Sequence, residues 1–142
     1  MPRKPAKRPR KIWTLQPPLH SPLPVPATIK EVVDIGAACL VESFLKPAYV
    51  KNPPPDWDFN YIVDIYARWT RNYFYFGARY CSPGPNALAP FFDSNFARME
   101  YVGDNLFTIA CLRRNNRWDP VGGAMPLDEC LEAVKTYPAF QL

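Results

Sequence analysis

Histidine and glycine are scarce in this sequence of 142 residues, which contains one histidine and six glycines. The histidine, His20, lies in a proline-rich stretch, so we expect no imidazole inside the folded domain for a general base or a catalytic dyad. The glycines lack the spacing of a phosphate-binding loop or a dinucleotide-binding turn. We therefore expect a non-enzymatic protein with no cofactor and no small-molecule substrate.

Close cysteine pairs and long apolar runs are also missing. The spacing of Cys39, Cys81, Cys111 and Cys130 is too wide for a structural zinc site, and reduced thiols in a cytoplasmic protein explain it best. No stretch approaches the ~18 to 20 consecutive apolar residues of a membrane span, and no apolar leader precedes a cleavage site. We expect a cytoplasmic protein that has no metal and does not contact a membrane.

Positive charge is concentrated at the start of the chain. Residues 1–12 hold six basic residues and no acid, whereas the rest of the chain has a net charge of −2. The six are Arg3, Lys4, Lys7, Arg8, Arg10 and Lys11. Such a run can bind nucleic acid, keep the chain soluble or contact an anionic membrane, and its prolines argue against an amphipathic membrane helix. The sequence leaves these alternatives open, and we favour nucleic acid, RNA or DNA.

Prolines separate this arm from a single folded domain. Twelve of the 18 prolines lie in the first 55 residues, and residues 17–26 are typical of an extended polyproline II spacer. We predict an arm over residues 1–27 and one domain over residues 28–142. The arm is then held away from the domain, within reach of a partner's surface.

The domain pattern predicts an α+β fold: an antiparallel meander sheet of four or five strands with two flanking helices. A helix over 28–46 begins at a capping box, Thr28 with Glu31, and ends at Pro47. A hairpin spans 59–81, residues 82–95 form a loop, and a second hairpin joins 96–102 to 106–114. A short strand around Trp118 and a helix over 127–136 complete the domain.

The first hairpin has a register that separates two faces. A turn at Arg71 and Asn72 sets Trp69 opposite Phe74 on an apolar face, and Asp64 opposite Arg79 on the other. The second face then gathers Tyr66, Arg68, Tyr73, Tyr75 and Arg79. Aromatic rings beside guanidinium groups suit the stacking of unpaired bases, but a protein-binding surface and ordinary sheet packing under the last helix fit as well.

Several segments resemble a family of short uncharacterised bacterial proteins. The resemblance is carried by residues 47–51, the hairpin 69–80, the loop 82–86, residues 96–103 and residues 126–131. It covers roughly residues 28–140 and leaves the basic arm outside. The resemblance implies a small bacterial α+β domain and, because the family has no assigned activity, no functional residue.

Together these patterns predict a non-enzymatic accessory subunit that contacts nucleic acid within a nucleoprotein assembly. The contact would run through the basic arm and, as a second surface, the face with tyrosine and arginine. The alternative is a protein–protein interaction or scaffold module whose arm is only a solvated tail. Oligomeric state and the identity of the partner do not follow from the sequence.

Overall fold

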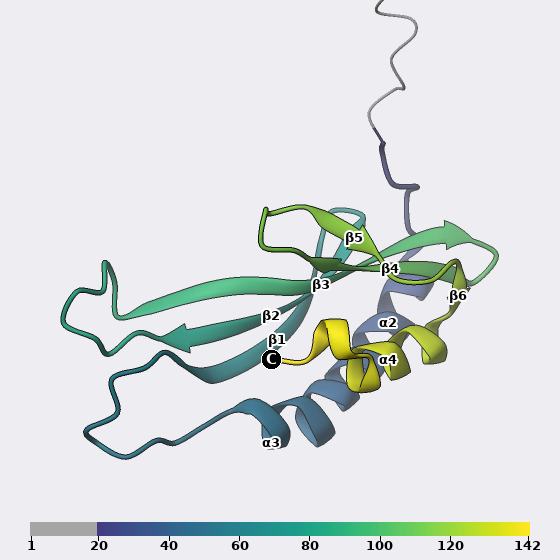
Figure 1. Ribbon diagram of the computed structural model, residues 1–142. Helices are drawn as coiled ribbons and strands as arrows, with labels where there is room; N and C mark the ends of the chain where they lie inside the picture. The colour runs from purple at the N-terminus through teal and green to yellow at the C-terminus, as the bar shows by residue number, and fades with distance from the viewer. Residues whose placement is uncertain (1–19) are drawn as a thin grey trace, which may run out of the picture.

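The computed structural model describes residues 20–142, and these form one sheet with helices on one side (Figure 1). The first helical segment comprises α2 (Ala27–Leu40), a π-helical turn η1 (Val41–Leu45) and α3 (Lys46–Tyr49). Six strands follow: β1 (Tyr61–Thr70), β2 (Tyr73–Cys81), β3 (Phe91–Gly103), β4 (Leu106–Leu112), β5 (Trp118–Pro120) and β6 (Met125–Pro126). The chain ends with α4 (Leu127–Thr136) and the 3-10 turn η2 (Pro138–Phe140).

The sheet is an antiparallel meander, as predicted. Its strand order is β1-β2-β3-β4-β5, and the two-residue β6 pairs with β4. Residues 82–90 link β2 to β3, whereas β1 and β2, and likewise β3 and β4, are joined by two-residue turns. Those turns rest on residues that tolerate positive φ, as at Asp104 (φ 53°) and Asn105 (φ 59°) between β3 and β4. The predicted α+β fold is confirmed.

The register of the first hairpin is confirmed from Asp64 to the turn. Trp69 pairs with Phe74, and Asp64 pairs with Arg79. Before Asp64 a β-bulge at Val63 shifts the pairing by one residue, so that Ile62 rather than Val63 lies opposite Tyr80. The bulge places Ile62 in the core, where only 7% of it is exposed.

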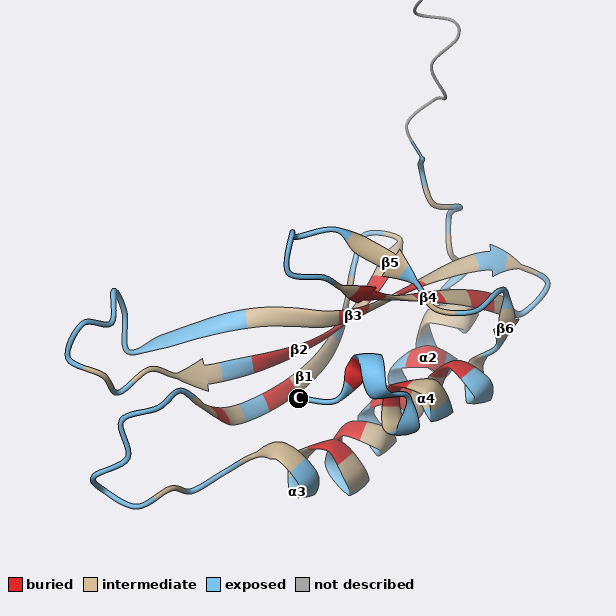
Figure 2. Cartoon of the chain, in the orientation of Figure 1, coloured by how far each residue is buried: buried red, intermediate tan, exposed pale blue. Residues whose placement is uncertain are grey.

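The core lies between the helices and one face of the sheet. Helix α2 contributes Val33 and Ala37, and α4 contributes Cys130 and Val134. These pack on strand residues that alternate along each strand, such as Phe74, Phe76, Met99 and Ile109. Figure 2 shows the buried stripe of each helix turned toward the sheet. The apolar residues that recur every 3.6 positions in the helices therefore pack on those that recur every second position in the strands, and together they form one apolar layer.

The start of the first helix differs from the prediction. The helix begins at Ala27 with Pro26 as its N-cap residue, and no side chain caps it. Thr28 and Glu31 consequently lie inside the helix, and the predicted capping box is wrong. The ring of Pro26 fixes its φ at −59°, and its carbonyl accepts the first helical hydrogen bond, from the Lys30 N–H at 3.0 Å.

The end of that helix is also different, because Pro47 does not terminate it. The π-helical turn lets the Lys46 N–H bond to the Val41 carbonyl, five residues back. Pro47 then sits in the first turn of α3, where its missing N–H and its ring are tolerated. The helical segment therefore continues to Tyr49 instead of ending at 46.

The predicted loop over 82–95 is too long. Strand β3 begins at Phe91 and pairs along β2, so that Phe91 lies opposite Cys81 and Phe92 opposite Tyr80. The Tyr80 and Phe92 rings stack with centroids 5.0 Å apart. Three prolines dominated the sequence pattern here, but all of them precede Phe91.

Within the described part of the chain, no helix is long and apolar enough to cross a membrane.

Candidate nucleic-acid interface

The face of the sheet turned away from the helices is open, and we call it the open face. No helix of residues 20–142 packs on it, and residues 20–26 approach the sheet from this side (Figure 1). The alternative in which the last helix covers this face is therefore wrong, since α4 packs on the core side through Cys130 and Val134.

The five predicted face residues all project from β1 and β2 toward the open face. Tyr66 and Arg68 lie on β1, opposite Gly77 and Tyr75 of β2. Tyr73 and Tyr75 are neighbours, with ring centroids 6.2 Å apart. The six basic residues predicted in the arm, by contrast, lie outside the described residues.

Tyr66 is fixed between the sheet and a guanidinium group. Its ring lies over Gly77, so closely that a Cβ atom added there would overlap the ring. The Arg68 guanidinium carbon lies 4.5 Å from the centroid of the same ring. Desolvation, followed by the negative charge of Asp93, raises the pKa of Tyr66. The ring is thus a supported platform with a guanidinium group beside it.

Arg98 of β3 occupies the centre of the open face. Its guanidinium carbon lies 4.3 Å from the centroid of Tyr73 and 4.9 Å from that of Trp118. Tyr75 contacts the same tryptophan, with ring centroids 5.8 Å apart. Strands β2, β3 and β5 therefore contribute to one cluster of aromatic and guanidinium groups, which holds the Arg98 side chain in place.

Arg98 and Trp118 were not among the predicted site residues. Arg98 could have been found from the sequence. It precedes Met99 on the same strand, and because side chains alternate, an apolar Met99 on the core face puts Arg98 on the other face. Extending the pairing of β2 with β3 would have set it beside Tyr75, as the structure does. Trp118 carried no such signal, since the length of the turn at residues 113–117 decides on which face it lies.

Arg79 behaves differently from the other predicted residues. It forms an ion pair with Asp93 at 3.5 Å, and its guanidinium carbon lies 5.1 Å from the Phe91 ring centroid. Next to this pair, Asn95 lies opposite Gly77, and its buried Oδ1 has no hydrogen-bond partner among residues 20–142. This end of the face therefore combines a neutralised arginine with a buried acceptor that lacks a partner among the described residues.

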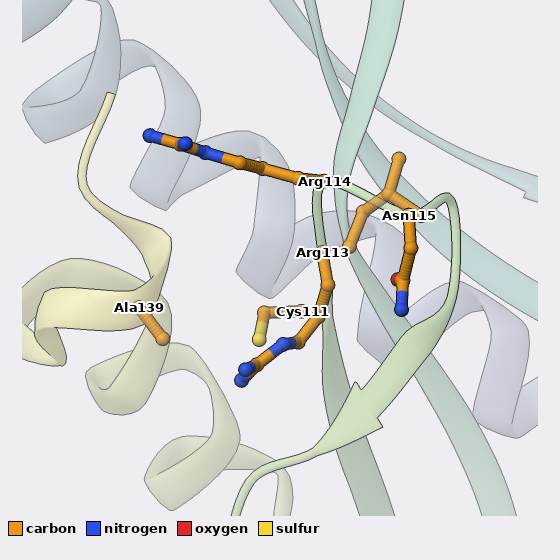
Figure 3. Close-up of a pocket in the computed structure, with 6 residues that line it drawn as sticks. Cys111, Arg113, Arg114, Asn115 and Ala139 are labelled. Carbon is orange, nitrogen blue, oxygen red and sulfur yellow. The ribbon is translucent and has the colours of Figure 1, made fainter.

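The turn from β4 to β5 carries further arginines around a hollow that reaches η2 and the buried Cys111, on the core side of the sheet. The hollow has a volume of about 510 Å³ and is lined by Cys111, Leu112, Arg113, Arg114, Asn115 and Ala139. In it the side chains of Arg113 and Arg114 diverge (Figure 3). Arg113 donates to Asp119 at 2.9 Å, whereas no ion pair is found for Arg114 within the described residues.

Charge is distributed unevenly between the two layers. The helices α2 to α3 and α4 contain six acidic residues and three lysines. All seven arginines of residues 20–142 lie in the strands and their turns. They are Arg68, Arg71, Arg79, Arg98, Arg113, Arg114 and Arg117. The strands and their turns also hold five acids, Asp64, Asp93, Glu100, Asp104 and Asp119, so their net charge is +2 against −3 for the helices. The helix layer is therefore acidic, and the sheet carries a small net positive charge.

Residues 20–26 connect the arm to the open face. His20 Nε2 lies 2.7 Å from a carboxylate oxygen of Glu100, which pairs with Tyr73 in the sheet. Further along, the Val25 N–H donates to Asn72 Oδ1 at 3.3 Å. The chain that precedes His20 therefore continues from the edge of the aromatic cluster.

In the described part of the chain, no three His, Cys, Asp or Glu side chains are grouped to hold a metal ion.

Comparison with known proteins identifies the family. The chain belongs to the family described as a domain of unknown function, DUF3024, whose profile matches residues 26–141. This confirms the resemblance to an uncharacterised family, while its bacterial origin stays a prediction. No curated protein and no solved structure matches. The matched range begins after the basic residues of the arm, and the division of the chain at residue 27 stays a prediction.

Proposed function

We propose that this member of a family without an assigned activity is a non-enzymatic accessory subunit that binds single-stranded nucleic acid in a nucleoprotein assembly. The observation that carries the proposal is the Arg98 cluster, in which a guanidinium group is held between Tyr73 and Trp118 on an open sheet face. Single strands are recognised by such faces because exposed rings and guanidinium planes stack on unpaired bases.

The arrangement of charge supports the proposal. The acidic helix layer is repelled by a polyanion, so a nucleic acid would approach the sheet, where the arginines lie. Arg68, Arg98 and Arg117 are available to contact phosphates or bases across successive strands. His20, which contacts Glu100 on this side of the domain, is the point from which the arm would reach the same nucleic acid.

Binding of oligonucleotides to nuclease-treated protein tests the proposal. We expect RNA or DNA single strands to bind more tightly than duplexes, because only unpaired bases can stack on the face. Deleting residues 2–12 should weaken binding to all sequences and reduce the salt slope by about 0.7 to 0.9 log–log units for each phosphate that the arm neutralises. Full-length protein that binds no nucleic acid at physiological salt overturns the proposal.

Variants of the open face separate stacking from charge. Changing both Tyr73 and Tyr75 to Ala should weaken binding of single strands, by roughly 1 to 3 kcal/mol per stacked base, and leave the salt slope nearly unchanged. Phe59→Ala is a matched control, because Phe59 is an aromatic residue with 70% exposure outside the cluster. Equal losses of affinity in the two variants would exclude the open face as the binding surface.

A protein-docking function is the second candidate, and a feature of the helix layer favours it. A hollow of about 370 Å³ lies between α2, α4 and the turn from β3 to β4, lined by Ile29, Val32, Asn105, Phe107, Pro126, Leu127 and Asp128. Beside it Val32 is 56% and Ile35 72% exposed on α2. A stable protein partner that survives nuclease and high salt would support this function. Loss of that partner in an Ile35→Asp variant would place it on α2.

A further inference from the structure

Strand β1 is an edge of the sheet, and its outer side is open over most of its length. Thr70 pairs with Tyr73 across a two-residue turn, so the even-numbered residues back from Thr70 to Asp64 direct their backbone N–H and C=O groups toward β2. Ile65, Ala67 and Trp69 direct theirs away from the sheet. Such unpaired backbone groups are a template for another strand.

The contacts at this edge agree with that assignment. The Ile65 N–H donates to the carboxylate of its neighbour Asp64 at 2.9 Å, which is a local substitute for a strand partner. Near the start of β1, the Lys51 N–H donates to the Ile62 carbonyl at 3.0 Å and covers that end. Among residues 20–142, no backbone group pairs with the outer side of β1 from Asp64 to Thr70.

A hollow runs beside this open stretch. It has a volume of about 270 Å³ and is lined by Asp34, Ala38, Val41, Glu42, Lys46, Asp64, Ile65, Tyr66 and Ala67. It therefore lies between the β1 edge and α2 with η1. A strand added to β1 would place the side chains of its inner face over this hollow.

The charges of β1 are complementary to those of a second copy. Asp64 and Arg68 are spaced equally on either side of Tyr66. When two β1 strands pair antiparallel about Tyr66, Asp64 of each copy faces Arg68 of the other. Tyr66 then faces its own counterpart, and Ile65 exchanges backbone hydrogen bonds with Ala67. Asp64 also lies 3.4 Å from Lys46 Nζ of its own chain, so Arg68 of the second copy would share this carboxylate with Lys46.

We propose that two copies of this protein associate through β1, antiparallel and centred on Tyr66, so that their sheets continue across the dimer axis. The two open faces then join. The two Tyr66 side chains and the two Asp64–Arg68 pairs lie where the copies meet. The association uses the edge of the sheet and not a ligand. The dimer uses Arg68, which the proposed function also uses, but its test measures association without nucleic acid, so failure of the dimer leaves the proposed function standing.

Charge exchange at the edge tests the dimer. Sedimentation velocity of the nuclease-treated full chain should show a species of about twice the 16.3 kDa monomer as protein concentration rises. Asp64→Arg and Arg68→Asp should each weaken dimerisation by about tenfold or more, because both symmetric pairs become repulsive. The double variant should restore it, and the two single variants mixed should form heterodimers.

Controls distinguish the edge from a general change in charge. Asp58→Arg and Arg114→Asp alter exposed residues away from β1 by the same charge and should leave the dimer intact. Circular dichroism and thermal unfolding of each variant report whether it folds. A monomeric wild type at high micromolar concentration overturns the proposal. A dimer that folded single variants retain, or that the double variant fails to restore, overturns it as well.

Discussion

The two faces of the sheet use aromatic residues for different purposes. On the core face, Phe74 and Phe76 are fully buried and meet edge to face, with ring centroids 5.4 Å apart. On the open face, Tyr73 and Tyr75 alternate with them along the same strand but remain half-buried and contact Arg98 and Trp118. One strand thus supplies both faces, and the neighbours of each ring determine its role. Apolar neighbours bury a ring and stabilise the fold, whereas guanidinium neighbours leave part of the ring exposed.

The largest expected effect separates the two faces by stability. Phe74→Ala removes a fully buried ring and should lower the free energy of unfolding by about 3 to 5 kcal/mol. Tyr75→Ala, one residue further on, should lower it by about 1 kcal/mol or less, because the site is open to water. Urea unfolding of both variants measures the difference. Equal losses of stability would mean that the open face is part of the core.

A smaller effect is expected at Gly77, which lies under the Tyr66 ring on the open face. Gly77→Ala places a Cβ atom against the Tyr66 ring and should destabilise the fold by about 1 to 3 kcal/mol, because the ring must leave its position. Combining it with Tyr66→Ala should remove most of that cost. A double-mutant cycle measures the coupling, and additive losses would show that backbone strain, and not the ring, causes the effect.

The core face also predicts a dependence on pH. Desolvation of the buried Cys130 thiol, with smaller effects of Glu129 and Asp128, raises its pKa from 9.0 to about 12. The raised pKa means that the folded state favours the protonated thiol, so its contribution to stability is complete below pH 9 and lost as the pH rises from there toward about 12.

Cys130→Ala should therefore reduce the loss of stability between about pH 8 and pH 10, by roughly 1 kcal/mol relative to the wild type. Urea unfolding at the two pH values measures this. The same pH dependence in wild type and Cys130→Ala would contradict the assignment.

The smallest expected effect concerns Arg98 on the open face. Arg98→Ala should lower the free energy of unfolding by about 0.5 to 1 kcal/mol, because the guanidinium group no longer stacks on Tyr73 and Trp118. Arg98→Lys should recover only part of this, because an ammonium group cannot stack in a plane between two rings. Thermal unfolding measures the series, and a decrease in stability as large as that of Phe74→Ala would assign Arg98 to the core.

Sequence patterns identified most of this fold because β1 and β2 alternate from Asp64 to the turn, and a two-residue turn fixes their register there. The same alternation assigned Tyr66, Arg68, Tyr73, Tyr75 and Arg79 to one face. Helix ends were less predictable, since Pro26 and the π-helical turn satisfy the backbone without the expected side-chain cap or break. Trp118 could not be placed, because its position depends on a turn with positive φ at Asn116.

The separation of charge between the layers has a kinetic consequence. A domain with acidic helices on one side and arginines on the other has an electric dipole across its thin dimension. In the field of a polyanion this dipole exerts a torque that turns the sheet toward the charge before contact. Under the proposed function, encounters with nucleic acid begin with the arginine side foremost, and we expect the association rate to fall as salt shortens the range of the field.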